Sequence, residues 1–335
     1  MISHSNKVVE SGIELNSFPA ELCTRYDLLN ITPTTPLRFT FCCPTQAIIH
    51  TSLVDLRAET KTSLGTLTGI LCVEGISENN YLSCSATDIY KNNVSIYTPT
   101  AGTYGTFCNQ ESIRLYNKDR GIAVSVLDAG ATGTLWVHLW DGNSFSTGTS
   151  VSLIADTTGS SKYCAIDYLD SDTAIIAVVD STDDYLELVK YVFSTNTATK
   201  LYSLSLGTWT AGTMCLSAFD LSNIFINTLG TIYKYDGSTI SVFTTTPAGQ
   251  IYGMTKKDRL LYYFDNVNSY IYSYDIDTAT ETIIQDYQMT SASILKLVNG
   301  YQGFGGLIGN PALLLVGNSP NDIISSTTKV NLRTF

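Results

Sequence analysis

One pattern recurs seven times along the chain: a short apolar strand, a tight turn, and a second strand rich in threonine and serine. The clearest copies are residues 191–200 (YVFSTNTATK) and 272–281 (YSYDIDTATE), which agree at the aromatic residue, the turn and the Thr-Ala-Thr triplet. Residues 233–241 (YKYDGSTIS) form a third copy between them, and the tyrosines that begin the three copies are about 42 and 39 residues apart. A repeat of this length indicates one supersecondary unit stacked against the next.

Weaker copies lie on both sides of these three. Residues 89–97 precede a TPTAG segment much as residues 232–240 precede a TTPAG segment, a correspondence that is hard to attribute to chance. Three further copies are recognisable at residues 138–145 (HLWDGNSF), 53–61 (LVDLRAETK) and 313–321 (LLLVGNSPN).

β-branched and aromatic residues dominate the chain, and no stretch places apolar residues at the three- and four-residue spacing of a helix. We therefore expect an all-β protein: a closed β-propeller built from four-stranded antiparallel sheets. Seven copies predict seven blades, with six or eight as the alternatives. Each blade would cover its apolar face with its neighbours, and ring closure would leave no exposed end blade.

Two local patterns refine this expectation. The Asp141-Gly142 and Asp236-Gly237 dipeptides are those preferred by two-residue hairpins, because both central residues of a type I′ turn need a positive φ. Small residues in the apolar strands that open several repeats predict equivalent positions close to the propeller axis: Cys72, Cys164, Cys215 and Gly253.

The first 36 residues carry three prolines and no clear copy of the repeat. We divide the chain into an N-terminal arm or ring-closing strand (1–36) and a propeller (37–335). Residues 7–15 could form a strand that pairs with residues 329–333, so that the two ends of the chain would close the ring.

The net charge of −11, with only 19 lysines and arginines, argues against nucleic-acid binding, which needs clustered basic residues. The longest apolar runs have strand length, so we expect no membrane insertion. The N-terminus lacks a basic and then apolar leader, which predicts synthesis in a cytosol without a signal peptide. Eight irregularly spaced cysteines without a Cys-x-x-Cys pair predict reduced, buried thiols.

Catalytic signatures are few. The three histidines lie in different parts of the chain, and His138, within an aromatic strand, is expected to be a packed or rim-exposed ring. Propeller enzymes that cleave sugars use carboxylates that converge on the channel, and the candidates here are Glu74, Asp167 and Asp220. The alternative interpretation is that these carboxylates cap loops.

The densest acidic segment, residues 180–187, could supply hard oxygen ligands for calcium from Asp180, Asp183 and Asp184. The segment lacks the Asp-x-Asp-x-Asp-Gly pattern of a calcium loop, so a solvated acidic loop is the default and no cofactor is expected.

The surface must be built from hydroxyls and amides, because the chain has 21 tyrosines and only 15% charged residues. Such surfaces suit carbohydrate and tight protein assembly. The candidates for stacking on sugar or for anchoring an interface are Trp136, Trp140 and Trp209, with indoles wedged between blades as the equal alternative.

Through its Asp-Gly turns and Tyr-x-Tyr-Asp repeats, the chain resembles the broad β-propeller superfamily over residues 37–335. Its motifs are generic, so no catalytic residue is carried over. The composition without a leader is similar in texture to virion proteins of bacterial viruses (phages), in which propellers occur in tail, nozzle and fibre components.

These observations predict a non-enzymatic virion or cell-surface propeller that serves as a structural platform or as an adhesion protein binding a host receptor or surface carbohydrate through one rim. Its expected partners are other virion or surface proteins and a host glycan, in a symmetric oligomer whose weak contacts add. A propeller glycoside hydrolase or lyase is the first alternative, and an intracellular interaction scaffold is the second.

Overall fold

The structure of the protein is a computed structural model, and strands dominate it. The described residues are 13–14, 27–28, 38–44, 49–55, 60–67, 70–77, 80–128, 133–154, 162–180, 185–207, 214–228, 230–244, 251–265, 268, 270–286, 312–318 and 328–334. Within them the helical segment α1 (Ala101–Tyr104) is a single turn, and no helix is long and apolar enough to cross a bilayer.

The described strands form seven sheets. Two sheets nearest the N-terminus have four strands each: β2 (Asp27–Leu28), β3 (Arg38–Pro44), β4 (Ile49–Asp55) and β5 (Thr60–Leu67), then β6 (Ile70–Ser77), β7 (Asn80–Ser85), β8 (Ile89–Lys91) and β9 (Val94–Tyr97). The next sheet contains β12 (Ile113–Asn117), β13 (Arg120–Asp128), β14 (Gly133–Trp140) and β15 (Phe145–Ser152), with the short β10 (Thr106–Phe107) added to β13.

The sheets that follow repeat the same order. One contains β16 (Lys162–Tyr168), β17 (Thr173–Asp180), β18 (Tyr185–Val192) and β19 (Thr197–Ser205), with β11 (Asn109–Gln110) parallel to β16. The other two contain β20 (Met214–Asp220), β21 (Asn223–Thr228), β22 (Thr231–Tyr235) and β23 (Ile240–Thr244), then β24 (Ile251–Lys257), β25 (Leu260–Asp265), β26 (Tyr270–Asp275) and β27 (Thr280–Asp286).

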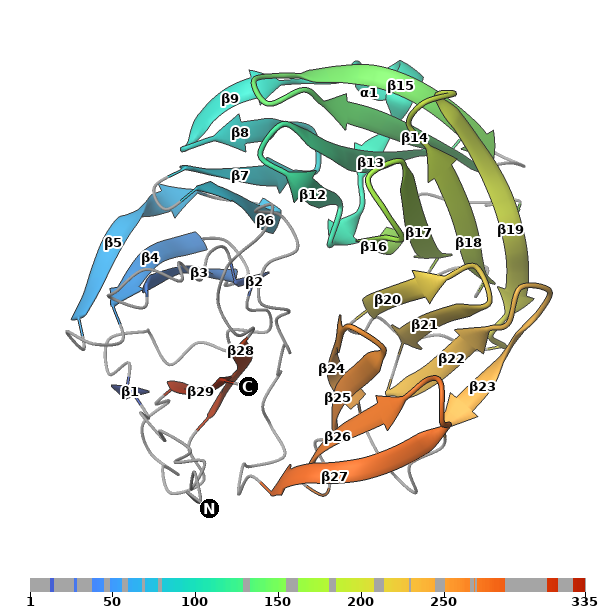
Figure 1. Ribbon diagram of the computed structural model, residues 1–335. Helices are drawn as coiled ribbons and strands as arrows, with labels where there is room; N and C mark the ends of the chain where they lie inside the picture. The colour runs from blue at the N-terminus through green and yellow to red at the C-terminus, as the bar shows by residue number, and fades with distance from the viewer. Residues whose placement is uncertain are drawn as a thin grey trace.

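In Figure 1 the sheets from β6–β9 to β24–β27 follow one another around a common centre, with the first strand of each sheet innermost and the last outermost. Consecutive strands within each sheet are antiparallel, for example in the pairing of β20 with β21 and of β21 with β22. The all-β fold and the repeated four-stranded antiparallel sheet predicted from the sequence are confirmed.

Apolar side chains fill the space between neighbouring sheets. Strand β17 shows why the sequence there is a continuous apolar run: Ala174, Ile176 and Val178 pack against the β12–β15 sheet, whereas Ile175 and Val179 pack against the β20–β23 sheet. Strand geometry points alternate side chains to opposite faces, and both faces of this strand are buried. Among the described residues, the β12–β15, β16–β19 and β20–β23 sheets each contribute core to two neighbours.

The two ends of the chain meet in one sheet. Strand β29 (Thr328–Thr334) pairs antiparallel with β28 (Ala312–Asn318), and β1 (Ile13–Glu14) adds to its other edge, with Ile13 opposite Val330. This sheet has three described strands, so the number of blades, ring closure and the division at residue 36 stay predictions.

The two Asp-Gly hairpins differ from the prediction. Trp140 lies opposite Phe145, and Tyr235 lies opposite Ile240, so each turn has four residues instead of two. The carboxylate of Asp236 accepts hydrogen bonds from the Ser238 and Thr239 amides. This side-chain cap stabilises a longer turn in which only the glycine needs a positive φ.

The predicted equivalence of the opening strands holds for two of the cysteines and fails for Cys164. Cys72 and Cys215 pack toward the following sheet, but Cys164 packs toward the preceding one. The β6–β7 and β20–β21 pairings contain a register shift near the turn, and β16–β17 runs without one. A one-residue difference in register turns a side chain to the opposite face of the sheet.

Candidate functional site at the inner strands

The innermost strands carry a row of charged residues close to their C-terminal ends. The row consists of Glu74, Arg114, Asp167 and Lys256. These four residues lie on β6, β12, β16 and β24, four of the innermost strands in Figure 1. We call them the inner belt. The belt contains Glu74 and Asp167, two of the three catalytic candidates.

Glu74 connects the β6–β9 sheet to the next sheet. It is 8% exposed, and its Oε1 accepts a hydrogen bond of 3.2 Å from the amide of Leu115 on β12. Its Oε2 lies 3.7 Å from the guanidinium of Arg114. The carboxylate therefore joins two inner strands through both a backbone donor and a cation.

Asp167, on the inner strand β16, has a similar set of contacts. Its Oδ2 accepts a 2.8 Å hydrogen bond from the amide of Ala218 on β20 and lies 2.8 Å from Nζ of Lys256 on β24. Leu115 and Ala218 occupy the same place in their sheets, directly before a register shift and two residues before the end of the strand. The two carboxylates thus fulfil the same role in different sheets.

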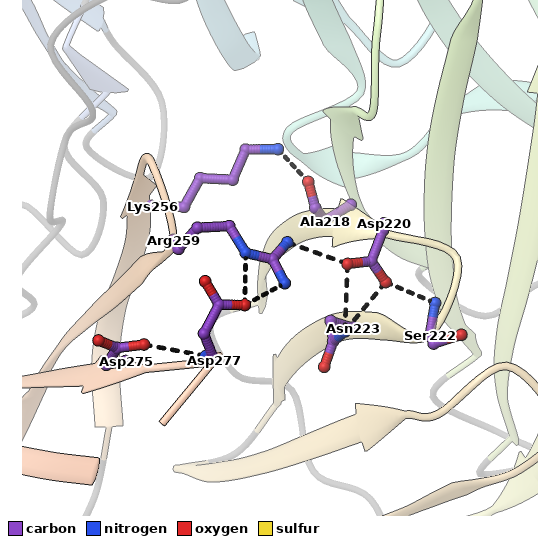
Figure 2. A network of polar contacts seen from close by, with 8 residues as sticks. All are labelled: Ala218, Asp220, Ser222, Asn223, Lys256, Arg259, Asp275 and Asp277. Carbon is purple, nitrogen blue, oxygen red and sulfur yellow. Dashed lines mark hydrogen bonds and ion pairs between the residues drawn. The ribbon is translucent and has the colours of Figure 1, made fainter. Parts of the chain in front are cut away.

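Lys256 completes the connection across three sheets. Its ammonium donates to the carbonyl of Tyr168 at 2.8 Å and to the carbonyl of Ala218, the contact drawn in Figure 2. The Tyr168 hydroxyl in turn donates to the carbonyl of Arg114 at 2.7 Å. The inner belt is therefore a continuous polar network between otherwise apolar sheet interfaces.

The electrostatics of the belt follow from this pairing. Burial alone would lower the pKa of Arg114, but the negative charges of Glu74, Glu111 and Asp167 raise it. Burial, reinforced by the charge of Glu74, raises the pKa of Tyr168 well above its usual value. Arg114 stays cationic and Tyr168 stays a neutral donor over the whole physiological range.

A catalytic carboxylate needs a free oxygen within reach of substrate and an acid or base partner. Glu74 and Asp167 both interact electrostatically with Arg114, yet each is buried and bound to a cation and a backbone amide. This geometry favours a structural role for both residues.

Asp220, the third candidate, lies outside the belt at the end of β20, directly before the β20–β21 turn, and its side chain is 42% exposed. Figure 2 shows Arg259, at the β24–β25 turn, between Asp220 and Asp277. Burial alone would raise the pKa of Asp220, but hydrogen bonds from Arg259, the Ser222 amide and Asn223 lower it. Asp220 therefore joins two neighbouring sheets at their turns and caps its own turn.

Within each sheet, one turn joins the first strand to the second and another joins the third strand to the fourth. These turns lie at one end of the molecule. Arg120 Nη1 donates to the carbonyl of Ser171 in the next sheet, and the Ser194 hydroxyl donates to Asp172 in its own sheet. A Cβ on Gly142 would lie 3.0 Å from Asp119. We call this end the turn face. Its aspartates outnumber the lysines and arginines at these turns (Lys91, Lys118, Arg120, Lys257 and Arg259) and comprise Asp119, Asp141, Asp170, Asp172, Asp220, Asp236, Asp258, Asp275 and Asp277.

Hydrogen bonds to the backbone hold many of these aspartates in fixed positions. Amide donors two and three residues further along bind Asp141, Asp170, Asp236 and Asp275. The hydrogen bonds from Thr239 and Ser238 lower the pKa of Asp236 to about 2. The turn face is thus a rigid and anionic surface at neutral pH.

The tryptophan candidates differ in their burial and hydrogen bonding. Trp140 is 3% exposed, and its indole donates to the Lys118 carbonyl at 2.8 Å, so this ring is wedged between sheets. Trp136 is half-buried, its indole N–H has no hydrogen-bond partner among the described residues, and the Tyr104 ring packs edge-on at 4.9 Å. Trp209 lies outside the described residues, and ligand binding by these tryptophans stays a prediction.

Sequence reasoning missed a polar chain that runs through His138. Its Nε2 lies 2.8 Å from Ser125 Oγ, which donates to the Tyr104 carbonyl, and its Nδ1 lies 2.9 Å from the Tyr97 hydroxyl. The histidine is fully buried, and burial lowers its pKa to about 4. No local motif predicts this chain, because its members come from β9, β13 and β14.

Among the described residues, no group of three or more His, Cys, Asp or Glu side chains is placed to hold a metal ion. Of the calcium candidates, Asp180 ends strand β17, and Asp183 and Asp184 lie outside the described residues.

No protein-family model matches the chain, and no curated protein is similar to it in sequence. Among solved structures, BBS1N, crystallised with ARL6DN, has 10% identity and a TM-score of 0.50 over 97% of each chain. Sqt1 of Saccharomyces cerevisiae has 11% identity and a TM-score of 0.46 over 90% of this chain and 94% of its own.

An acylaminoacyl peptidase of Pyrococcus horikoshii has 10% identity and a TM-score of 0.48 over 93% of this chain. This chain spans about half, 52%, of the peptidase. At such identities the similarity concerns the fold alone, and the likeness to BBS1N supports a propeller-like arrangement of sheets.

Proposed function

We propose that the protein is a non-enzymatic platform that binds or assembles with partners through the turn face, as a structural or receptor-binding component of a virion or cell surface. The observation that carries the proposal is the use of the inner carboxylates. Glu74 and Asp167 are buried, and each binds a cation and a backbone amide of another sheet.

The turn face has the properties of a preorganised binding surface. Many of its aspartates, Asp236 among them, accept hydrogen bonds from backbone amides of their own turns. Their carboxylate oxygens, with neighbouring serine and threonine hydroxyls, can also accept hydrogen bonds from a partner. Little conformational entropy is lost when such a surface binds. Sugar hydroxyls are matching donors, so the proposed ligand class is a surface glycan, with a protein carrying the glycan as its natural form.

A binding experiment with matched charge changes tests the proposal. The purified chain is tested against a panel of surface polysaccharides, beside a variant with Asp119→Asn and Asp258→Asn. Both residues are exposed, and asparagine tolerates the positive φ of 52° at position 258. The control variant, Ala86→Lys with Thr103→Lys, changes the net charge equally at exposed positions in connections away from the turn face.

We expect the turn-face variant to lose at least about tenfold in affinity for the polysaccharide that the wild type binds, equivalent to about 1.4 kcal/mol, and the control variant to keep it. Equal loss in both variants would show that net charge and not the turn face determines binding. Shortened polysaccharide products would support the glycoside hydrolase or lyase alternative and refute the proposal.

A further inference from the structure

Two cysteines face each other across the first two strands of the β6–β9 sheet. Cys72 of β6 lies directly opposite Cys84 of β7 in the antiparallel register. The two sulfur atoms are 3.4 Å apart, and the residues are 2% and 0% exposed. Neither side chain belongs to the inner belt or to the turn face.

A serine from the neighbouring segment bridges the two thiols. Ser112 Oγ lies 3.1 Å from the sulfur of Cys72 and 2.9 Å from that of Cys84, and it is fully buried. The hydroxyl can donate to one sulfur and accept from the other. It therefore provides the polar contact that a sulfur needs when it gives up its proton in an apolar interface.

Directly opposed residues of antiparallel strands have Cα atoms about 4.5 or 5.5 Å apart, depending on the pair type. Both values lie within the range of about 4.4–6.8 Å found in disulfides. Rotation of the two side chains therefore suffices to join the sulfurs, and the backbone can stay in place. We propose that Cys72 and Cys84 are a redox-sensitive pair that forms a cross-strand disulfide under oxidising conditions.

The reaction needs an oxidant, for which a low-molecular-weight disulfide such as oxidised glutathione is sufficient. The thiolate of one cysteine attacks this disulfide, forms a mixed disulfide and releases one glutathione thiolate. The second cysteine then attacks the protein sulfur of the mixed disulfide and releases the second glutathione. Two protein thiols lose two electrons and two protons, and one glutathione disulfide becomes two thiols.

A second pair of buried cysteines, Cys108 and Cys164, lies nearby and offers a competing link. Burial, reinforced by a hydrogen bond with Cys108, raises the pKa of Cys164. A thiol that keeps its proton is a poor nucleophile. Because Cys72 and Cys84 are also buried, exchange requires the β6–β7 edge to open or the reaction to take place while the chain folds.

The disulfide would stabilise the folded protein. It would join the inner strand that carries Glu74 to the second strand of its sheet, with twelve residue positions separating the two cysteines. Closing such a loop restricts the unfolded chain. The oxidised protein should have a melting temperature about 5 °C above that of the reduced protein.

The test uses the full chain in two experiments: the native protein held in glutathione buffers of rising potential, and the denatured protein refolded in the same buffers. Remaining thiols are alkylated, and the links are identified by mass spectrometry of peptides under non-reducing conditions. The variants are Cys72→Ala, which removes one partner, and Cys215→Ala, which changes a buried cysteine of a different sheet.

We expect a Cys72–Cys84 link in the wild type and in Cys215→Ala, the loss of two titratable thiols, and the higher melting temperature, reversed by dithiothreitol. Absence of the link in both experiments, or a dominant link between other cysteines such as Cys108 and Cys164, would overturn the proposal. The wild-type peptide map decides this even if Cys72→Ala does not fold.

Discussion

Acidification should destabilise the protein through His138, because this ring is neutral and buried in the folded state. In the unfolded chain a histidine has a pKa of about 6.5, whereas burial lowers the folded-state pKa of His138 to about 4. Between these values the unfolded chain binds one more proton than the folded chain. Stability is therefore complete above about pH 6.5 and is lost as the pH falls toward 4.

The magnitude follows from the two pKa values. Each pH unit within the window is worth about 1.4 kcal/mol, so the contribution of His138 decreases by about 2 kcal/mol at pH 5 and by about 3 kcal/mol near pH 4. The histidine accepts from the Tyr97 hydroxyl and donates to Ser125, so protonation also disturbs a fixed chain of hydrogen bonds.

Urea unfolding of the wild type and of His138→Gln between pH 7.5 and 5 isolates this effect. Glutamine offers a donor group and an acceptor group and does not titrate, and the carboxylates titrate alike in both proteins. The free energy of unfolding of the wild type should therefore decrease by about 2 kcal/mol more than that of the variant. A difference between the two proteins that stays constant over this pH range would refute the assignment.

Three further predictions test the sheet contacts and the turns. Lys256→Met should lower the free energy of unfolding by about 3–5 kcal/mol, because it leaves Asp167 buried without its cation; urea titration should also show partial recovery when Asp167→Asn is added. Gly105→Ala should lower the melting temperature by about 5 °C or more, because position 105 has a φ of 74° and a Cβ there would clash with the Val126 carbonyl. Gly102→Ala is the control: a Cβ at position 102 has open space around it, so the melting temperature should stay unchanged. Asp236 should titrate near pH 2 in an NMR experiment, so its contribution to stability is present above pH 4 and disappears as the pH falls through 2; a normal pKa would show that the turn is open in solution.

The repeat made the fold predictable, because each copy had to bury both faces against similar copies. Its details were less accessible, as the best-matched pair of repeats shows. The sequence match aligns Thr197 with Thr278, but in the structure the residue that starts the outer strand after the turn is Thr197 in one sheet and Thr280 in the other. The match was displaced by two residues, which preserves the face of the sheet and therefore leaves the apolar pattern intact.

The candidate site was predicted only in part. The position of Glu74 and Asp167 on inner strands was readable, because both follow an apolar opening strand. Their partners were not, since the Ala218 amide and the Lys256 ammonium come from other sheets, far away in the sequence. Contacts between sheets depend on register shifts of one residue, which leave no local signal.

The central claim is that the inner carboxylates hold sheets together in a binding platform. The most direct test is to analyse whether the protein shortens a polysaccharide. Each polysaccharide of the panel would be incubated with the wild type and with Asp167→Asn, and its chain length measured by mass spectrometry. The account predicts bound polysaccharide of unchanged length with the wild type. Shorter products that form with the wild type and are lost with a folded Asp167→Asn variant would contradict it.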